Sequence, residues 1–161
     1  MKILSNRGLN LTACGLSVLL LSIGYYLQYV KGIQPCPLCV VQRAAFIGCG
    51  LIFLLAAVHH PREWGRRIYA LFGFVFATLG IALAIRHLWI QQHPSQAVQV
   101  CVPGYQYVLK HFPFQQALNF FLKSADNCSQ VTTVLGLSIP IWSLIGFAGL
   151  AIIALALLLK K

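Results

Sequence analysis

Six cysteines are the residues of this chain that can do redox chemistry, and their positions divide them into two groups. Cys14 and Cys49 lie inside long apolar runs, where a thiol usually acts as a small, inert hydrophobic side chain. The other four lie at the edge of an apolar run or between two runs. We take these four as the candidate catalytic residues: Cys36, Cys39, Cys101 and Cys128.

Cys36 and Cys39 belong to a Cys-Pro-Leu-Cys motif at the start of the second apolar run. A CxxC pair alone fits either a redox-active disulfide or half of a zinc site. The position favours redox chemistry, because Pro37 suits the first turn of a helix and makes Cys36 the expected N-cap. A thiolate there faces free backbone N–H groups and the positive end of the helix dipole, and Cys39 shares this stabilisation.

Arg43 lies four residues after Cys39, so we expect both side chains on one face of a helix. A cation at that place stabilises a Cys39 thiolate and can hold a carbonyl or anionic oxygen beside it. The alternative is an arginine whose charged end reaches the membrane interface. A charge inside a membrane segment next to a redox pair favours the functional interpretation. Arg86 and His87 lie near the end of the third run, at the same membrane surface as Cys39 and Arg43. Either side chain can bind such an oxygen or anchor the helix at the membrane interface.

The composition predicts that lipid surrounds these residues. The 161 residues are 59% hydrophobic and 9% charged, whereas about 25% of a soluble domain is charged. Four apolar runs are each close to the ~20 residues that cross a ~30 Å hydrocarbon core. They are residues 9–29, 40–58, 68–90 and 138–159. No strand pattern is evident, so we expect an all-α membrane protein, a four-transmembrane-helix bundle made by a single domain of residues 1–161.

The basic residues predict the orientation of the bundle. The net charge is +10, with Glu63 and Asp126 as the acidic residues. Seven of the 12 lysines and arginines lie near the two termini or in the loop of residues 59–67, and three lie in the loops of residues 30–39 and 91–137. By the positive-inside rule, the termini and the first of these loops are cytoplasmic, and the other two loops are periplasmic.

A strongly basic chain can also bind nucleic acid, but the sequence contains no known nucleic-acid recognition module, which disfavours that function.

The long outer loop contains one amphipathic segment, residues 113–122. Pro113 suits a first helical turn, and apolar side chains from Phe114 and Leu118 onward share one face at helical spacing. We expect a short helix that lies flat on the membrane surface. A short buried helix is the alternative, although the loop offers little for it to pack against.

All four candidate cysteines lie on the predicted outer side of the membrane, which is oxidising and allows disulfides to persist. Four cysteines permit three pairings, of which the simplest joins Cys36 to Cys39 and Cys101 to Cys128. A disulfide in a loop without an evident core is labile and suited to exchange with a partner protein. A structural staple is the alternative for the loop pair.

Together these residues resemble the disulfide bond formation protein B (DsbB) family of bacterial inner-membrane thiol–quinone oxidoreductases. The resemblance covers nearly the whole chain: four apolar runs, CPLC at the start of the second, Gln42-Arg43 after it, Cys101 and Cys128 in the outer loop, and IPIWSLIGF entering the fourth run. Gln42 is one departure, because a well-studied member of the family carries an acid before the arginine. This difference removes a charge next to the expected quinone.

The resemblance implies a disulfide relay. A reduced DsbA-like periplasmic protein of thioredoxin fold attacks the loop disulfide and forms a mixed disulfide at Cys101. Released Cys128 then attacks Cys36. Cys39 leaves as a thiolate and donates electrons to ubiquinone, or to menaquinone as the alternative acceptor.

The resemblance also assigns Arg43 to the quinone contact and places His87 near the same site. It implies no bound metal. It implies the inner membrane of a Gram-negative bacterium, with cytoplasmic termini, periplasmic active cysteines, and the lipid and quinone pool as surroundings. Capping alone favours Cys36 as the most stabilised thiolate. The family route and the Arg43 spacing favour Cys39, which we follow.

Other functions stay open at this stage. A specialised paralogue that oxidises a dedicated partner thiol protein has the same sequence features. A vitamin K epoxide reductase-like enzyme also has four helices and a CxxC, although there we expect the active pair near the last helix. In a different class, the four outer cysteines can form a zinc-binding membrane scaffold, which requires converging reduced thiolates in an oxidising compartment. A transporter is disfavoured, because no acid lies inside an apolar run and no inverted repeat is visible.

Overall fold

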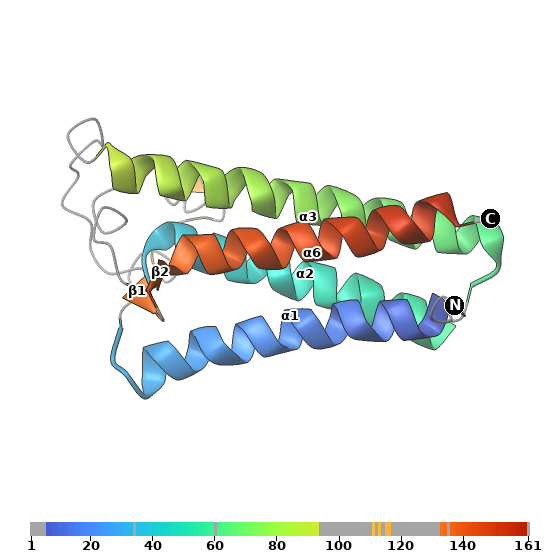
Figure 1. The fold of residues 1–161 in the computed structure, drawn as a ribbon, viewed down its shortest axis with the longest axis horizontal. Helices are drawn as coiled ribbons and strands as arrows, with labels where there is room; N and C mark the ends of the chain where they lie inside the picture. Colours follow the sequence, from blue (N-terminus) through green and yellow to red (C-terminus); the bar gives the residue numbers. More distant parts are fainter. Residues whose placement is uncertain are drawn as a thin grey trace.

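Four long helices pack side by side in the computed structural model (Figure 1). The model describes residues 6–33, 35–59, 61–93, 111, 113, 115–116, 133–134 and 136–160. The helices are α1 (Asn6–Tyr29), α2 (Pro37–His59), α3 (Glu63–Gln92) and α6 (Ile139–Leu159). Each is long and apolar enough to cross a membrane. The predicted all-α bundle of four membrane helices is therefore confirmed.

α1, α2 and α3 extend beyond the apolar runs from which they were predicted, whereas α6 lies within its run of residues 138–159. α3 begins at Glu63 and ends at Gln92, whereas the apolar run covers residues 68–90. α1 and α2 begin three residues before their runs, at Asn6 and Pro37. Hydropathy marks the part of a helix that lies in hydrocarbon, while the backbone hydrogen bonds continue into the polar residues beside it.

A small hairpin precedes α6, although the sequence showed no strand pattern. Strands β1 (Thr133–Val134) and β2 (Leu137–Ser138) pair antiparallel, and Gly136 between them has a φ of 81° that glycine adopts readily. Two residues per strand are too few for an alternating pattern to be recognised. The Trp142 indole donates a hydrogen bond of 3.1 Å to the Val134 carbonyl, which ties the hairpin to α6.

A stripe of small residues on α3 determines how closely the helices approach. The buried residues of α3 recur at spacings of three and four: Arg66, Ala70, Gly73, Ala77, Gly80, Ala84, His87 and Ile90. A Cβ at Gly80 would lie 2.3 Å from the Phe147 ring of α6, and one at Gly73 would lie 2.8 Å from the Phe53 ring of α2. Small residues allow this close packing in membrane proteins. Because His87 continues the same stripe, its imidazole is turned into the bundle.

Aromatic packing fills the centre of the bundle, and large apolar side chains cover its outside. The rings of Phe46 and Phe147 stack with centroids 3.8 Å apart. Val58, Ile152 and Leu159 are among many large apolar side chains that are exposed on the helices. An apolar exterior of this extent is suited to lipid rather than water.

The two ends of the bundle differ in what they carry (Figure 1). Both chain termini and the α2–α3 connection lie at one end, where the Arg66 guanidinium donates a hydrogen bond to the Lys160 carbonyl at the end of α6. The start of α2, the end of α3 and the hairpin lie at the opposite end. The CPLC motif is therefore separated from the termini by the length of the bundle.

Candidate active site at one end of the bundle

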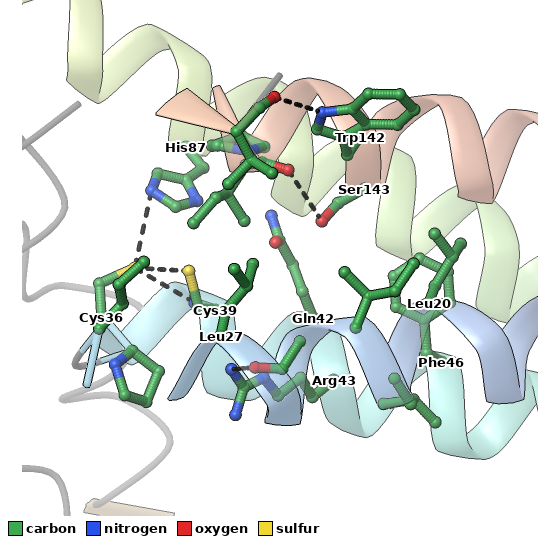
Figure 2. Close-up of a pocket in the computed structure, with 18 of the residues that line it drawn as sticks. Leu20, Leu27, Cys36, Cys39, Gln42, Arg43, Phe46, His87, Trp142 and Ser143 are labelled. Carbon is green, nitrogen blue, oxygen red and sulfur yellow. Dashed lines mark hydrogen bonds between the residues drawn. The ribbon is translucent and has the colours of Figure 1, made fainter. Parts of the chain in front are cut away.

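A cavity of about 230 Å³ opens at the end of the bundle that carries the CPLC motif. All four helices and Val134 of β1 line it, mostly with apolar side chains. Figure 2 shows the polar groups that the helices bring to its wall. Those that we consider as candidate site residues are Cys36, Cys39, Gln42, Arg43 and His87.

Cys36 caps the N-terminus of α2, as its position before Pro37 predicted. Its sulfur accepts a hydrogen bond from the Cys39 backbone N–H at 3.3 Å, and its carbonyl accepts one from the Val40 N–H at 3.2 Å. The side chain therefore satisfies one of the N–H groups that a helix start leaves without an intrahelical partner. This capping fixes the Cys36 sulfur at the positive end of the helix dipole.

The two cysteines of the motif form a dithiol pair in this structure. The Cys36 thiol donates to the Cys39 sulfur, with 3.1 Å between the two sulfur atoms. Both cysteines line the cavity; Cys36 is buried and Cys39 is half-buried. A hydrogen bond to Cys39 favours negative charge on that sulfur. The assignment of the persistent thiolate to Cys39 stays a prediction.

His87 reaches the pair from α3. Its Nε2 lies 3.6 Å from the Cys36 sulfur, and its side chain is buried. Its Nδ1 has no hydrogen-bond partner within the described ranges. The neighbouring Arg86 is exposed, so only the histidine of this predicted pair faces the cavity. At this distance the imidazole can exchange a proton with the Cys36 thiol.

Arg43 lines the same cavity as Cys39, although its hydrogen bonds go to α1. The guanidinium donates to the Gln28 side-chain carbonyl and, at 2.9 Å, to the Gly24 backbone carbonyl. It also lies 5.0 Å from the centre of the Tyr25 ring, within the range of a cation–π contact. In the described part of the chain no hydrogen bond joins Arg43 to Cys39.

Sequence reasoning missed the α1 residues that position Arg43. A Cβ at Gly24 would lie 3.4 Å from the Arg43 Nε, so the glycine leaves room for the guanidinium. Tyr25 and Gln28 lie near the end of the first apolar run. The sequence signal that could have identified them is the spacing of Gly24 and Gln28, which lie four residues apart and therefore share one helix face.

Cys36, Cys39 and His87 also form a possible set of metal ligands, because their ligand atoms all lie within 4.8 Å of one another. In this structure the two sulfurs lie 3.1 Å apart and share a hydrogen bond. The predicted loop residues Cys101 and Cys128, and the core of the predicted surface helix, lie outside the described residues.

Comparison with known proteins shows the family. Residues 6–157 match the family model described as disulfide bond formation protein DsbB. This chain belongs to the DsbB family. It is therefore a multi-pass inner-membrane oxidoreductase that takes part in disulfide bond formation.

Relatives named disulfide bond formation protein B match most or all of the chain. The protein of Stutzerimonas stutzeri is 43% identical over all of this chain and 99% of its own length. That of Hahella chejuensis is 47% identical over 81% of this chain and 79% of its own. That of Azoarcus is 40% identical over 98% of this chain and 95% of its own. Membership of the DsbB family favours the redox interpretation of the CPLC pair over the vitamin K epoxide reductase-like and zinc-scaffold alternatives.

The contact with Cys36 predicts a catalytic effect of His87 in this DsbB-family protein. We expect His87→Leu to lower the turnover number for disulfide formation by about a hundredfold, because a positioned proton acceptor is lost. The measurement is steady-state oxidation of a reduced dithiol protein in the presence of the quinone acceptor that the family resemblance implies. His93→Leu serves as the control, since His93 is exposed at the end of α3 and does not line the cavity. Equal turnover in the two variants would contradict this role.

The hydrogen bonds of Arg43 to α1 predict that its substitution changes binding in the cavity rather than binding of the partner protein. For the quinone acceptor that the family resemblance implies, we expect Arg43→Ala to raise the KM by about tenfold or more, because α1 loses two charge-assisted hydrogen bonds that hold the cavity wall. The KM for the dithiol partner should change less than about twofold. Arg43→Lys should recover only part of the loss, since an ammonium cannot span both acceptors as a guanidinium does. Unchanged quinone kinetics in Arg43→Ala would refute the assignment.

Proposed function

We propose that this DsbB-family protein is a thiol:quinone oxidoreductase. It reoxidises a periplasmic dithiol oxidase of the DsbA type and passes the electrons to ubiquinone, or to menaquinone, in the membrane. One observation carries the proposal: the Cys36–Cys39 pair opens through Cys39 into a largely apolar cavity formed by membrane helices.

The cavity suits a quinone ring in size and in lining. Its volume of about 230 Å³ exceeds the roughly 150 Å³ of a protein cavity that binds benzene. Leu20, Leu27 and Phe46 supply apolar surface, while Gln42, Arg43 and His87 supply polar atoms. A few polar groups in a mostly apolar pocket are typical of small-molecule sites. The long apolar tail of a quinone would lie in the surrounding lipid.

The relay conserves electrons and protons. A partner thiolate attacks the Cys101–Cys128 disulfide at Cys101, and the second partner thiol displaces it, so the partner is oxidised. Cys128 then attacks Cys36 of the Cys36–Cys39 disulfide and releases the Cys39 thiolate. Cys101 attacks Cys128, which forms the loop disulfide again and releases the Cys36 thiolate. The Cys36 and Cys39 thiolates then give two electrons to the quinone and form their own disulfide again. The two protons lost by the partner's thiols are balanced by the two taken up when quinone becomes quinol.

The driving force is consistent with a quinone acceptor. DsbA is itself a strong oxidant, with a reduction potential of about −120 mV, and the DsbA–DsbB–quinone system is known to keep the bacterial periplasm oxidising. Reoxidation of such a partner requires an acceptor with a higher potential, and a membrane quinone pool supplies one.

We place the CPLC end of the bundle on the periplasmic side. The termini lie together at the opposite end, near Arg62 of the α2–α3 connection and Arg66 and Arg67 at the start of α3. Basic residues favour the cytoplasmic side. The α3 end and β1, which flank the loop with Cys101 and Cys128, lie at the CPLC end, so this loop begins and ends beside the cavity.

The decisive experiment supplies the purified protein, in lipid nanodiscs, with a reduced DsbA-type protein and a short-tailed ubiquinone. We expect one quinol to form for each pair of partner thiols oxidised. A Cys14→Ala, Cys49→Ala variant should behave like the parent protein, because neither thiol lines the cavity. Partner oxidation without quinone consumption would overturn the proposal. Strong preference for one partner over a general DsbA would indicate the specialised paralogue.

A further inference from the structure

We propose that Gln42 positions the quinone ring by donating a hydrogen bond from its side-chain amide to a ring oxygen. This inference rests on the quinone acceptor proposed above and assigns a new role within that site. In the sequence, Gln42 stood out only as a departure from an acidic residue.

The Gln42 amide is buried without a hydrogen-bond partner in the described part of the chain. Its side chain is 2% exposed, and its Nε2 has no acceptor. Buried amide groups in proteins are nearly always hydrogen-bonded, because an unpaired one loses its water without compensation. An unpaired donor beside a cavity therefore indicates that a ligand oxygen completes the site.

The Gln42 side chain lies in the wall of the same cavity as the Cys39 sulfur. Gln42 lies three residues, about one helical turn, after Cys39, and both line the cavity. Figure 2 shows the Gln42 side chain extending from α2 toward Ser143 of α6, on the same side as the Cys39 sulfur. A ring lying against Cys39 would thus place one of its oxygens within reach of the amide.

The neighbouring polar side chains have other partners. Arg43 donates to Gln28 and Gly24 of α1, and the Ser143 hydroxyl donates to the Ile139 carbonyl at 3.4 Å. His87 contacts Cys36 through its Nε2. Two buried polar atoms of the cavity lining have no hydrogen-bond partner in the described part of the chain, the Gln42 Nε2 and the His87 Nδ1. The amide nitrogen is always a donor, whereas the imidazole nitrogen donates in only one of its two neutral tautomers.

A neutral amide is chemically suited to this position. Its N–H can bind a quinone carbonyl oxygen and binds it more strongly as the ring gains electrons and the oxygen becomes negative.

The test compares Gln42→Leu with the parent protein and with Gln92→Leu, a glutamine exposed at the end of α3 outside the cavity. We expect Gln42→Leu to raise the KM for short-tailed ubiquinone about tenfold, equivalent to one lost hydrogen bond of ~1.4 kcal/mol. The KM for the dithiol partner should not change. Gln92→Leu should match the parent protein.

Infrared spectroscopy gives a readout that a purely structural role would not produce. We expect the carbonyl stretch of bound 13C-labelled ubiquinone to shift to lower frequency in the parent protein, and part of this shift to vanish in Gln42→Leu. Without quinone, the variant should melt at the same or a higher temperature, because an unpaired buried donor has been removed. If Gln42→Leu does not fold, Gln42→Met supplies the same comparison. A bound quinone whose spectrum is unchanged in the variant would overturn the role of Gln42, whereas no quinone binding to the parent protein would overturn the proposed function itself.

Discussion

Cys39→Ser is expected to abolish quinone reduction, with a loss of roughly a thousandfold or more, because no other described sulfur both faces the cavity and pairs with Cys36. The serine hydroxyl cannot form the disulfide with Cys36 or give up electrons to the acceptor. The measurement is quinol formation by purified protein supplied with a reduced dithiol partner.

Two comparisons make this prediction specific. Cys49→Ser is the matched control, since Cys49 is fully buried in the bundle core and should leave turnover unchanged once folding is verified. Cys101→Ser should stop oxidation of the partner but leave Cys36 and Cys39 able to react with quinone when reduced by a small dithiol. Residual turnover of Cys39→Ser above a few per cent would show that electrons leave through another residue.

Gly80→Leu is expected to cause the largest loss of stability among single substitutions in α3. A Cβ there would lie 2.3 Å from the Phe147 ring, and the Phe147 side chain is fully buried, so it cannot move away. Overpacking of this kind costs about 1–3 kcal/mol or more, and the close α3–α6 approach would be lost. The thermal unfolding temperature in detergent or lipid measures the effect.

The control for Gly80 is another helical glycine with space around it. A Cβ at Gly15 of α1 meets nothing within 4 Å, so Gly15→Leu should be tolerated. We also expect Gly80→Leu to reduce disulfide formation in the fraction that folds, because His87 lies on the same stripe of α3 and would move relative to Cys36. Equal melting temperatures for the two glycine variants would contradict the packing explanation.

The local features of the site followed from the sequence because their causes are local. Pro37 after Cys36 predicted where α2 begins, and the structure has the Cys36 sulfur accepting the Cys39 N–H. The spacing of Cys39 and Arg43 predicted a shared face, and both side chains line one cavity. The four helices could be predicted because lipid leaves helices as the only open-ended way to satisfy backbone hydrogen bonds.

What the sequence could not determine was which helices contact one another and at what distance. Arg43 turns to α1 because Gly24 leaves space and Gln28 offers an acceptor, and His87 reaches Cys36 because small residues bring α3 close to its neighbours. The unpaired amide of Gln42 exists only once the surrounding helices have buried it. Hydropathy and spacing report the surroundings averaged over one helix, whereas these contacts join residues far apart in the chain, and only tertiary packing brings them together.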